Sequence, residues 1–401
     1  MPKPLEQLEE FAIDVILERR YGKRAAILRV FLHALSGIYH RIVRWRLALF
    51  EKRIAAVHTL GCQVISVGNL TVGGTGKTPI VEKLARELTQ GGRKVAILSR
   101  GYKSVPKPFS QRLADRIFFR TEKTPPRIVS DGRSLFLDSE RSGDEPFMLA
   151  NNLKDVVVLV DKNRVKSGLY AIERYGCDTL LLDDGFQYLP LKERLDVVLV
   201  DRETPFGNRF LLPRGTLREP PAHLKRADIL FITKCTGSDI SDLKQEIRRF
   251  NRHAPMIECA HHPVHLEDVY TGEKKPLEFL KDLRVGALSG IARPESFEHG
   301  LKALGAEILY SRRFADHHRF TQQEIIHTIT RSKARSARAV VTTEKDAVRF
   351  TRLERRDLPV YFLRVEIKIL QGQDIFDGLV DRLCHRVAAP LHEVEAALLT
   401  G

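Results

Sequence analysis

Cysteine is scarce in this sequence and follows no metal-binding pattern. The 401 residues contain five cysteines, and no two of them form a C-x-x-C pair. Zinc sites and disulfide frameworks need cysteines at short, regular spacings, so the sequence argues against both and for a reducing compartment. The first residues are acidic and lack an apolar core, so no signal peptide is expected. The cysteines are Cys62, Cys177, Cys235, Cys259 and Cys384.

Aromatic and acidic residues are also few. Aromatic side chains make up 7% of the chain, and 51 acidic residues face 66 basic ones, which gives a net charge of +15. Such a surface attracts polyanions, namely nucleic acid, anionic membranes or phosphorylated substrates. Because no stacking aromatics interleave the basic stretches, we expect no nucleic-acid partner. Charged residues at 29% and hydrophobic residues at 43% are otherwise typical of a globular protein.

Long uninterrupted apolar runs are missing as well. Residues 24–53 have helical periodicity, but Arg29, Arg41, Arg44 and Arg46 break the run of about 20 apolar residues that a membrane span needs. One interpretation is an interfacial helix with its apolar stripe in the acyl boundary. The other is a helix packed on the protein's own core, and the basic flanks favour the membrane surface. The stripe consists of Ile27, Phe31, Leu35, Ile38, Ile42, Trp45 and Leu49.

The most informative segment of the chain is VISVGNLTVGGTGKTPIVEKLAREL, residues 64–88. A run of apolar β-formers enters a glycine-rich turn that opens into an amphipathic helix, which is the arrangement of a P-loop. Backbone N–H groups of such a turn surround phosphate, its lysine reaches the β- and γ-phosphates, and its threonine ligates Mg²⁺. The strict pattern has glycine where this chain has Thr71. The predicted nucleotide-binding residues are Thr71, Val72, Gly73, Gly74, Thr75, Gly76, Lys77 and Thr78.

Further strands predict the fold class. Thr179 and three leucines at 180–182 run into Asp183 and Asp184, a strand end typical of carboxylates that reach the nucleotide's Mg²⁺. Strands alternating with helices predict an α/β fold, namely a P-loop NTPase-like, mostly parallel sheet with helices on both faces. The expected division is an N-terminal basic helix region at 1–58, a nucleotide-binding kinase domain at 59–255 and a smaller α/β domain at 256–401.

Two acidic or histidine-containing loops have an ordinary interpretation from local signals alone. Asp144 precedes an apolar run and is predicted as a helix N-cap. The Asp316-His317-His318 triplet is predicted as a solvated loop rather than a metal site, because adjacent histidines rarely face one ion. After it, residues 321–324 have the pattern of a capping box. Residues 103–127 have no clear periodicity and are predicted as a long excursion.

Taken together, the motifs resemble those of the tetraacyldisaccharide 4′-kinases, the lipid A kinases of Gram-negative bacteria, over about residues 25–365. The resemblance implies transfer of the ATP γ-phosphoryl group to the 4′-hydroxyl of tetraacyldisaccharide 1-phosphate, a lipid A precursor. It also implies Mg²⁺ dependence and peripheral attachment to the cytoplasmic face of the inner membrane. The motifs are VGNLTVGGTGKTP (67–79), SRGY (99–102), GDEP (143–146), LDDGFQ (182–187), GTLREP (215–220), SGIARPESF (289–297), FADHH (314–318) and TTEKDAV (342–348).

The resemblance also implies roles for individual residues. Asp144 corresponds to the catalytic aspartate and His317 to its partner histidine from the smaller domain, so closure of the two domains is expected to bring them together. Lys77 and Arg218 are expected to neutralise charge during transfer. The metal ligands are expected among Thr78, Asp183 and Asp184. The second-rank candidates are Glu145, Arg100, Tyr102, Gln187 and Glu219.

A different class of function also fits the P-loop and the basic helix. A membrane-associated P-loop ATPase or GTPase, acting as a switch or a metal-insertion chaperone, would hydrolyse nucleotide with water and would not need Asp144 or His317. The sequence leaves the oligomeric state open.

Overall fold

The computed structural model describes residues 4–101, 124–192, 195–351, 353 and 357–385. The chain divides into two compact units. Unit 1 consists of Met1–Leu98, Ile172–Ala260 and Ile369–Gly401, and unit 2 consists of Ser99–Ala171 and His261–Lys368. These bounds differ from the predicted domains mainly at 99–171, which group with the later residues of the chain. Tyr102 and most of the predicted excursion lie outside the described residues.

Unit 1 contains a parallel sheet with strand order β7-β6-β1-β5-β2, and the start of β8 pairs in parallel with β7. Its strands are nearly all buried, as expected for a sheet covered on both faces. The strands are β1 (Gln63–Asn69), β2 (Val95–Ser99), β5 (Thr179–Asp183), β6 (Leu195–Asp201), β7 (Ile229–Thr233) and β8 (Met256–Asp268).

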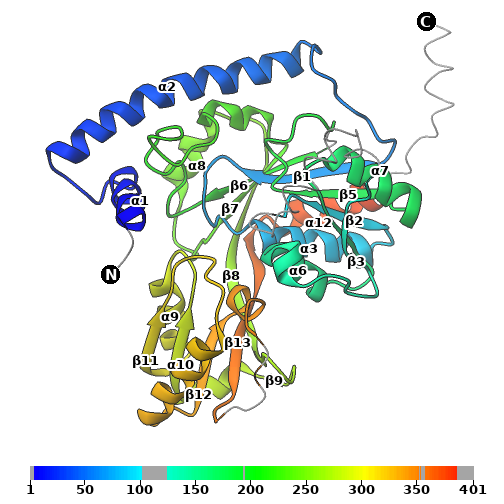
Figure 1. The fold of residues 1–401 in the computed structure, drawn as a ribbon. Helices are drawn as coiled ribbons and strands as arrows, with labels where there is room; N and C mark the ends of the chain where they lie inside the picture. The colour runs from blue at the N-terminus through cyan, green and yellow to red at the C-terminus, as the bar shows by residue number, and fades with distance from the viewer. Residues whose placement is uncertain (1–3, 102–123, 193–194, 352, 354–356, 386–401) are drawn as a thin grey trace, which may run out of the picture. The chain divides into compact units, whose positions relative to one another are not determined.

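Helices cover the unit 1 sheet. Helix α3 packs on β1 and β5, and α12 packs in turn on α3, as Figure 1 shows. Helix α8 packs through Ile247 on a core that includes Val198 and Leu230. The helices are α1 (Pro4–Ile16), α2 (Lys23–Glu51), α3 (Lys77–Gln90), α7 (Arg164–Tyr175, which continues from unit 2), η1 (Pro221–Arg226), α8 (Ser241–Arg248) and α12 (Gln373–His385).

Helix α2 occupies the segment for which the sequence predicts a basic amphipathic helix. Its polar side contacts the rest of unit 1: Ser36 is buried and donates a hydrogen bond to the carbonyl of Leu211 at 3.0 Å. The apolar stripe lies on the opposite side and is largely exposed, with Ile27, Ile38 and Trp45 among its exposed members. The interpretation as a helix that buries this stripe in the protein's own core is therefore wrong.

Unit 2 is a second α/β structure with parallel strands in the order β11-β10-β12-β13. Strands β8 and β9, and β3 and β4, pair antiparallel. The strands are β3 (Arg127–Asp131), β4 (Val157–Val160), the later part of β8, β9 (Lys274–Lys275), β10 (Arg284–Ser289), β11 (Glu307–Arg313), β12 (Ala339–Thr343) and β13 (Val360–Gln371, which continues into unit 1).

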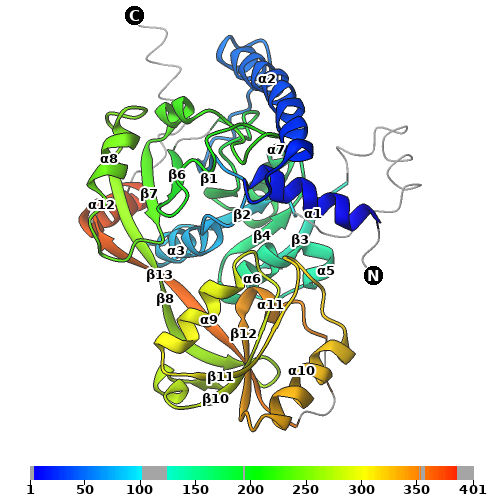
Figure 2. The ribbon, with the colours of Figure 1, turned by 90° about the vertical axis from the view of Figure 1, so that its left-hand side faces the viewer.

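The two faces of the β10–β12 sheet are covered by different helices, because side chains alternate along a strand. On β10, Ala287 joins a cluster with Leu301 of α9, whereas Leu288 joins a cluster with Ile325 of α10. Figure 2 shows α9 and α10 on opposite sides of these strands. The helices are α5 (Ser139–Ser142), α6 (Asp144–Asn152), η2 (Leu277–Leu280), α9 (Pro294–Ala303), α10 (Gln322–Ala334) and α11 (Glu344–Ala347).

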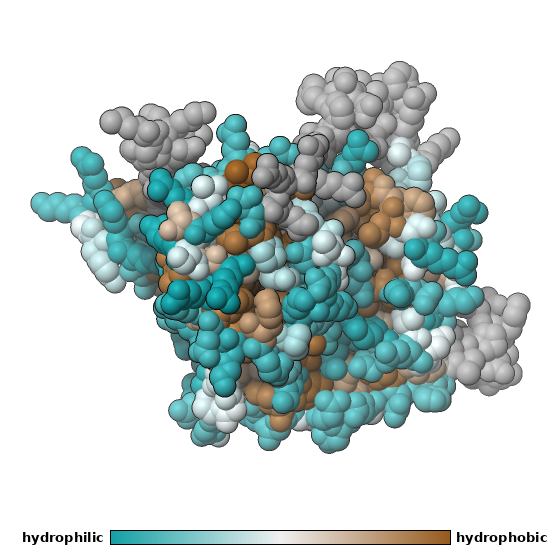
Figure 3. All heavy atoms as spheres, turned by 90° about the horizontal axis from the view of Figure 1, so that it is seen from below, coloured by the Kyte–Doolittle hydropathy of each residue, from teal (hydrophilic) through white to brown (hydrophobic). Residues whose placement is uncertain are grey.

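Several local predictions are confirmed. The α/β class and the mostly parallel sheets are as expected. Thr321 and Glu324 form the predicted capping box at the start of α10. The face drawn in Figure 3 is mainly hydrophilic, with smaller hydrophobic patches between the polar side chains. The N-cap prediction for Asp144 is wrong: Gly143 is the N-cap of α6, and Asp144 is its first helical residue.

A close approach of two backbones fixes the loop after β5 against β1. A Cβ atom added at Gly68 would lie 2.5 Å from Cβ and 2.7 Å from the backbone nitrogen of Phe186. Real Cβ atoms do not approach other atoms so closely, so a larger residue at 68 must displace one of the two segments.

We therefore expect Gly68→Ala to lower the free energy of unfolding of unit 1 by about 1–3 kcal/mol, the usual cost of overpacking. Urea or thermal unfolding followed by circular dichroism measures this. Gly378→Ala is the matched control, because a Cβ on this residue of α12 meets open space and alanine is the better helix former. Equal stability of the two variants would contradict the prediction.

Candidate functional site

The P-loop of unit 1 lies between the end of β1 and the start of α3. Gly73 and Gly76 have φ values of 120° and 82°, a region that residues with a side chain rarely adopt. Asn69 accepts a hydrogen bond from Lys77 Nζ at 3.2 Å and so places this lysine at the start of α3. The result is a turn at a helix N-terminus, where backbone N–H groups and the helix dipole favour anions.

Two neighbouring segments hold the P-loop from the side. The segment 216–218 pairs with it through the backbone, since Thr216 O accepts from Val72 N and Arg218 N donates to Leu70 O, both at 2.7 Å. At the end of β7, Thr233 Oγ1 donates to Thr75 O at 2.9 Å. The loop that carries Arg218 is thus fixed directly to the predicted nucleotide-binding turn.

Asp184 lies between two cations at this end of the sheet. Its carboxylate is 3.5 Å from Lys77 Nζ, and Arg218 Nη1 donates to both of its oxygens at 2.8 Å. Asp183, at the end of β5, is buried. Gln187 accepts from Arg218 at 3.4 Å and donates to the backbone carbonyl of Asn69 at 3.0 Å.

The structure therefore gathers the residues that the sequence predicts for phosphate and metal binding. Thr78, Asp183 and Asp184 offer hard oxygen ligands, which suit Mg²⁺ because it needs only one or two carboxylates beside phosphate oxygens and water. Among the described residues, no three His, Cys, Asp or Glu side chains lie together in a way that could hold a metal ion. Glu219, a second-rank candidate, has other partners. It pairs with His223 Nδ1 at 2.7 Å and with Arg226 at 2.8 Å in a buried cluster.

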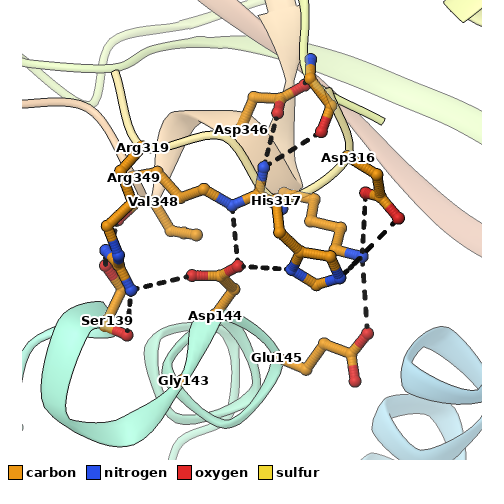
Figure 4. A network of polar contacts seen from close by, with 12 residues as sticks. Ser139, Gly143, Asp144, Glu145, Asp316, His317, Arg319, Asp346, Val348 and Arg349 are labelled. Atoms are coloured by element: carbon orange, nitrogen blue, oxygen red, sulfur yellow. Dashed lines mark hydrogen bonds and ion pairs between the residues drawn. The ribbon is translucent and has the colours of Figure 1, made fainter. Parts of the chain in front are cut away.

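Unit 2 contains the second set of predicted residues, drawn in Figure 4. His317 Nδ1 lies 3.0 Å from Asp144 Oδ2, although 173 positions separate the two residues. Both belong to unit 2, so in this structure the contact lies within one unit, whereas the predicted domain bounds placed the two residues in different domains. The solvated-loop interpretation of the triplet is also wrong for His317, which is mostly buried in this contact, while His318 pairs with Glu324.

Cations surround Asp144. Arg349 Nε donates to Asp144 Oδ2 at 2.7 Å, and Arg319 Nη2 lies 3.5 Å from Oδ1. Burial raises the pKa of the Asp144 carboxyl, but the His317 hydrogen bond and the two arginines outweigh this effect and hold the pKa below its ordinary value. Asp144 is thus a buried, ionised carboxylate.

Sequence reasoning missed four residues of this cluster, namely Arg319, Lys345, Asp346 and Arg349. Three of them follow strand β12, at the carboxyl end of a parallel strand, where ligands of α/β folds bind. That position is the signal that could have identified them. Glu145 lies 3.7 Å from Lys345 Nζ. Arg100 is exposed directly after β2.

Comparisons with known proteins agree with these features. The model of the family "Tetraacyldisaccharide-1-P 4′-kinase" matches residues 28–384. A protein of Anaeromyxobacter sp. (strain Fw109-5) named tetraacyldisaccharide 4′-kinase is 38% identical over 361 residues, which is 88% of this chain and 92% of the relative. One of Syntrophus aciditrophicus with the same name is 37% identical over 366 residues, 89% of this chain and 92% of the relative.

A solved structure is similar as well. The crystal structure of LpxK from Aquifex aeolicus in complex with ATP superposes with a TM-score of 0.68 at 29% sequence identity. The match covers 89% of this chain and all of that one. The similarity in sequence and in structure therefore extends over both units, and the P-loop NTPase-like fold class predicted from the sequence is confirmed.

The position of Asp184 between Lys77 and Arg218 predicts that the effect of Asp184→Asn on ATP affinity depends on Mg²⁺. In EDTA the variant should bind ATP about tenfold more tightly, equivalent to ~1.4 kcal/mol, because a negative charge beside the phosphate site is removed. With Mg²⁺ the gain in affinity should disappear, because a predicted metal ligand is lost. Isothermal titration calorimetry measures both.

Asp242→Asn, in the first turn of α8, is the control that changes the net charge equally. Unchanged ATP affinity of Asp184→Asn in EDTA would show that Asp184 does not compete with phosphate for these cations.

Proposed function

The chain belongs to the tetraacyldisaccharide-1-phosphate 4′-kinase family, and from this premise we propose that it transfers the γ-phosphoryl group of ATP to the 4′-hydroxyl of tetraacyldisaccharide 1-phosphate. The observation that carries the proposal is the contact between Asp144 and His317, 3.0 Å apart. A switch ATPase that activates water has no use for this pair. A kinase for a sugar hydroxyl does, because that hydroxyl is a poor nucleophile until a base accepts its proton.

The P-loop is the proposed ATP site. Backbone N–H groups of residues 71–78 would surround the phosphates, and Lys77 would contact the β- and γ-phosphates. Thr78, Asp183 and Asp184 would hold Mg²⁺, which when bound neutralises charge on the β- and γ-phosphate oxygens. Arg218, already paired with Asp184, would add positive charge where charge develops during transfer.

Asp144 is the proposed base. As the 4′-oxygen of the lipid forms its bond to the γ-phosphorus, the hydroxyl proton passes to the Asp144 carboxylate and the bond from phosphorus to the bridging oxygen of ADP breaks. His317 donates its Nδ1 hydrogen to the other carboxylate oxygen and so fixes the orientation of Asp144. Because phosphoryl transfer depends mainly on positioning and charge neutralisation, this orientation matters as much as basicity.

Helix α2 is the proposed membrane contact, on the cytoplasmic face of the inner membrane. By length and composition α2 could cross a membrane, contrary to the expectation that its arginines exclude this. Its polar contacts favour a helix that lies along unit 1: Tyr39 Oη donates to Arg218 O at 2.9 Å, and Arg46 donates to Gln187 O at 3.0 Å. A spanning helix would have to give up these bonds. Lying along the unit leaves the apolar stripe for the acyl boundary and the basic flanks for lipid phosphates.

The kinase proposal predicts that Asp144→Ala and His317→Ala each lower lipid phosphorylation by about 10²–10⁴-fold, the usual contribution of general acid–base catalysis. ATP binding should survive, because the P-loop lies in unit 1. The measurement is transfer of labelled phosphate from ATP–Mg²⁺ to tetraacyldisaccharide 1-phosphate in detergent micelles.

His318→Ala is the matched control, since this neighbouring histidine pairs with Glu324, and it should retain activity. ATP hydrolysis without a lipid product, indifferent to Asp144→Ala and His317→Ala, would replace the kinase by the switch ATPase.

The membrane proposal predicts a blue shift of tryptophan fluorescence when anionic phospholipid vesicles are added. Trp45 is the single tryptophan of the chain and is 66% exposed, so it reports on the stripe alone. Phe31→Asp should weaken vesicle binding several-fold, because it places a charge in the apolar stripe. Ile326→Asp, at an exposed isoleucine of α10, is the control and should bind like the wild type. No shift with vesicles would contradict a role of α2 at the membrane.

A further inference from the structure

We propose that the turn 343–349 is a clamp for the Asp144–His317 pair, with Arg349 and Lys345 as positioning residues that leave a single carboxylate oxygen of Asp144 to accept the substrate proton. This inference rests on the kinase function proposed above. The turn follows β12 and contains α11.

Arg349 holds one oxygen of Asp144. The Arg349 side chain is 0% exposed, and its Nε donates to Asp144 Oδ2 at 2.7 Å. His317 Nδ1 meets the same oxygen at 3.0 Å. With two donors on Oδ2, the oxygen that remains for the substrate hydroxyl is Oδ1. Arg319 donates to Ser139 O at 3.0 Å and reaches Oδ1 only at 3.5 Å, so the protein's contact with Oδ1 is the weaker one.

Arg349 is itself fixed from behind. Its Nη1 donates to Asp346 Oδ1 at 3.0 Å and to Gly290 O at 3.1 Å. Asp346 is fully buried and accepts from Thr343 Oγ1 and from Gly290 N. A Cβ at Gly290 would lie 3.1 Å from Asp346 Oδ1, so the loop after β10 lies close to the Asp346 carboxylate that binds Arg349. The guanidinium therefore has little room to rotate, and Figure 4 shows it between the two carboxylates.

Lys345 sets the hydrogen position on His317. Its Nζ lies 3.3 Å from His317 Nε2. A protonated lysine only donates hydrogen bonds and an ionised carboxylate only accepts them, so the ring hydrogen lies on Nδ1 and Nε2 accepts from Lys345. Asp316 Oδ2, 3.8 Å from Nε2, would compete for the ring hydrogen once Lys345 is removed. In this tautomer His317 donates to Asp144 Oδ2 and does not compete for the substrate proton. Glu145 and Asp316 lie 3.7 and 3.9 Å from Lys345 Nζ and support its charge.

The same turn also holds helix α6, which begins with Asp144. Glu344 accepts from Asn152 Nδ2 at 2.6 Å, at the last residue of that helix, and pairs with Arg364 at 2.7 Å. The turn thus contacts α6 at both ends. The alignment of the Arg349 guanidinium with Asp144 Oδ2 therefore indicates positioning of the carboxylate rather than packing alone.

The kinetic test uses the full-length protein with tetraacyldisaccharide 1-phosphate and ATP–Mg²⁺. Arg349→Met should lower kcat on the order of 10²-fold, the cost of a small misplacement of a catalytic group, with the KM for ATP unchanged. Arg349→Lys, which keeps the charge, should recover part of the loss. In an Asp144→Ala background, Arg349→Met should have no further effect, because Arg349 acts through Asp144. Wild-type kcat in Arg349→Met, or additive losses in the double variant, would overturn the proposal.

The pH profile adds a readout that a packing role would not change. The groups that face Asp144 are His317, Arg349 and Arg319, and each lowers its pKa. Loss of Arg349 should raise the pKa of Asp144, and the base works only when ionised. The acid limb of kcat should therefore move to higher pH in Arg349→Met. An unmoved limb would contradict the clamp.

The tautomer test does not depend on activity. In ¹⁵N-histidine NMR spectra, with His317→Gln used for assignment, the wild type should show the Nδ1–H tautomer of His317 and Lys345→Met a mixture of tautomers. An Nε2–H ring in the wild type, or no change in Lys345→Met, would overturn the clamp. A wild type that shows the Nδ1–H ring but phosphorylates no lipid would instead refute the kinase function, while the positioning of His317 by Lys345 would still hold.

Discussion

The ion pair between Asp144 and Arg349 is the interaction on which the organisation of unit 2 depends. Taking a carboxylate and a guanidinium out of water costs several kcal/mol each, and removing one partner of such a pair typically costs about 3–5 kcal/mol. Four segments meet at this pair, namely the start of α6, the loop after β10, the loop before α10 and the turn after β12. Their relative positions are therefore fixed by electrostatics, while the hydrophobic clusters on the two sheet faces supply the bulk of the burial.

The charged groups at the end of the unit 1 sheet are arranged differently from those around Arg349. Here a single carboxylate, that of Asp184, faces Lys77 and Arg218. Lys77, Arg218 and the N-terminus of α3 place positive charge around Asp184 at the end of the sheet, which suits a ligand that brings several negative charges of its own. In unit 2 Arg349 sits between two carboxylates, so that the charge is largely balanced within the protein. The first arrangement attracts a polyanion, and the second holds a group in place.

Much of the fold and part of the site could be predicted from the sequence, because the relevant signals are local. The P-loop, the apolar strands, the capping box at Thr321 and helix α2 each extend over a few consecutive residues. The Asp183–Asp184 strand end could be identified as a metal ligand candidate only because a P-loop precedes it. The resemblance to a known family supplied the pairing of Asp144 with His317, which local signals interpret as an N-cap and a solvated loop.

What the sequence could not predict involves contacts between distant segments. Helical periodicity places Ile38 and Ser36 on opposite sides of α2, but it does not say which side meets the protein. Arg349 is one of 66 basic residues, and its contact with Asp144 joins segments 205 positions apart, which no local pattern reveals. The grouping of residues 99–171 with unit 2 likewise depends on contacts between segments that are distant in the sequence.

Arg218 joins three parts of unit 1 through three different groups. Its backbone N–H donates to the carbonyl of Leu70, directly before the P-loop. Its own carbonyl accepts from Tyr39 of α2, and its guanidinium donates to Asp184. If a bound nucleotide displaced this residue, the hydrogen bond to the helix would change, and a displacement of the helix would change the geometry around Asp184. Linkage then requires equal effects in both directions: to the extent that lipid contact with α2 strengthens nucleotide binding, nucleotide strengthens the hold of the helix on lipid by the same free energy.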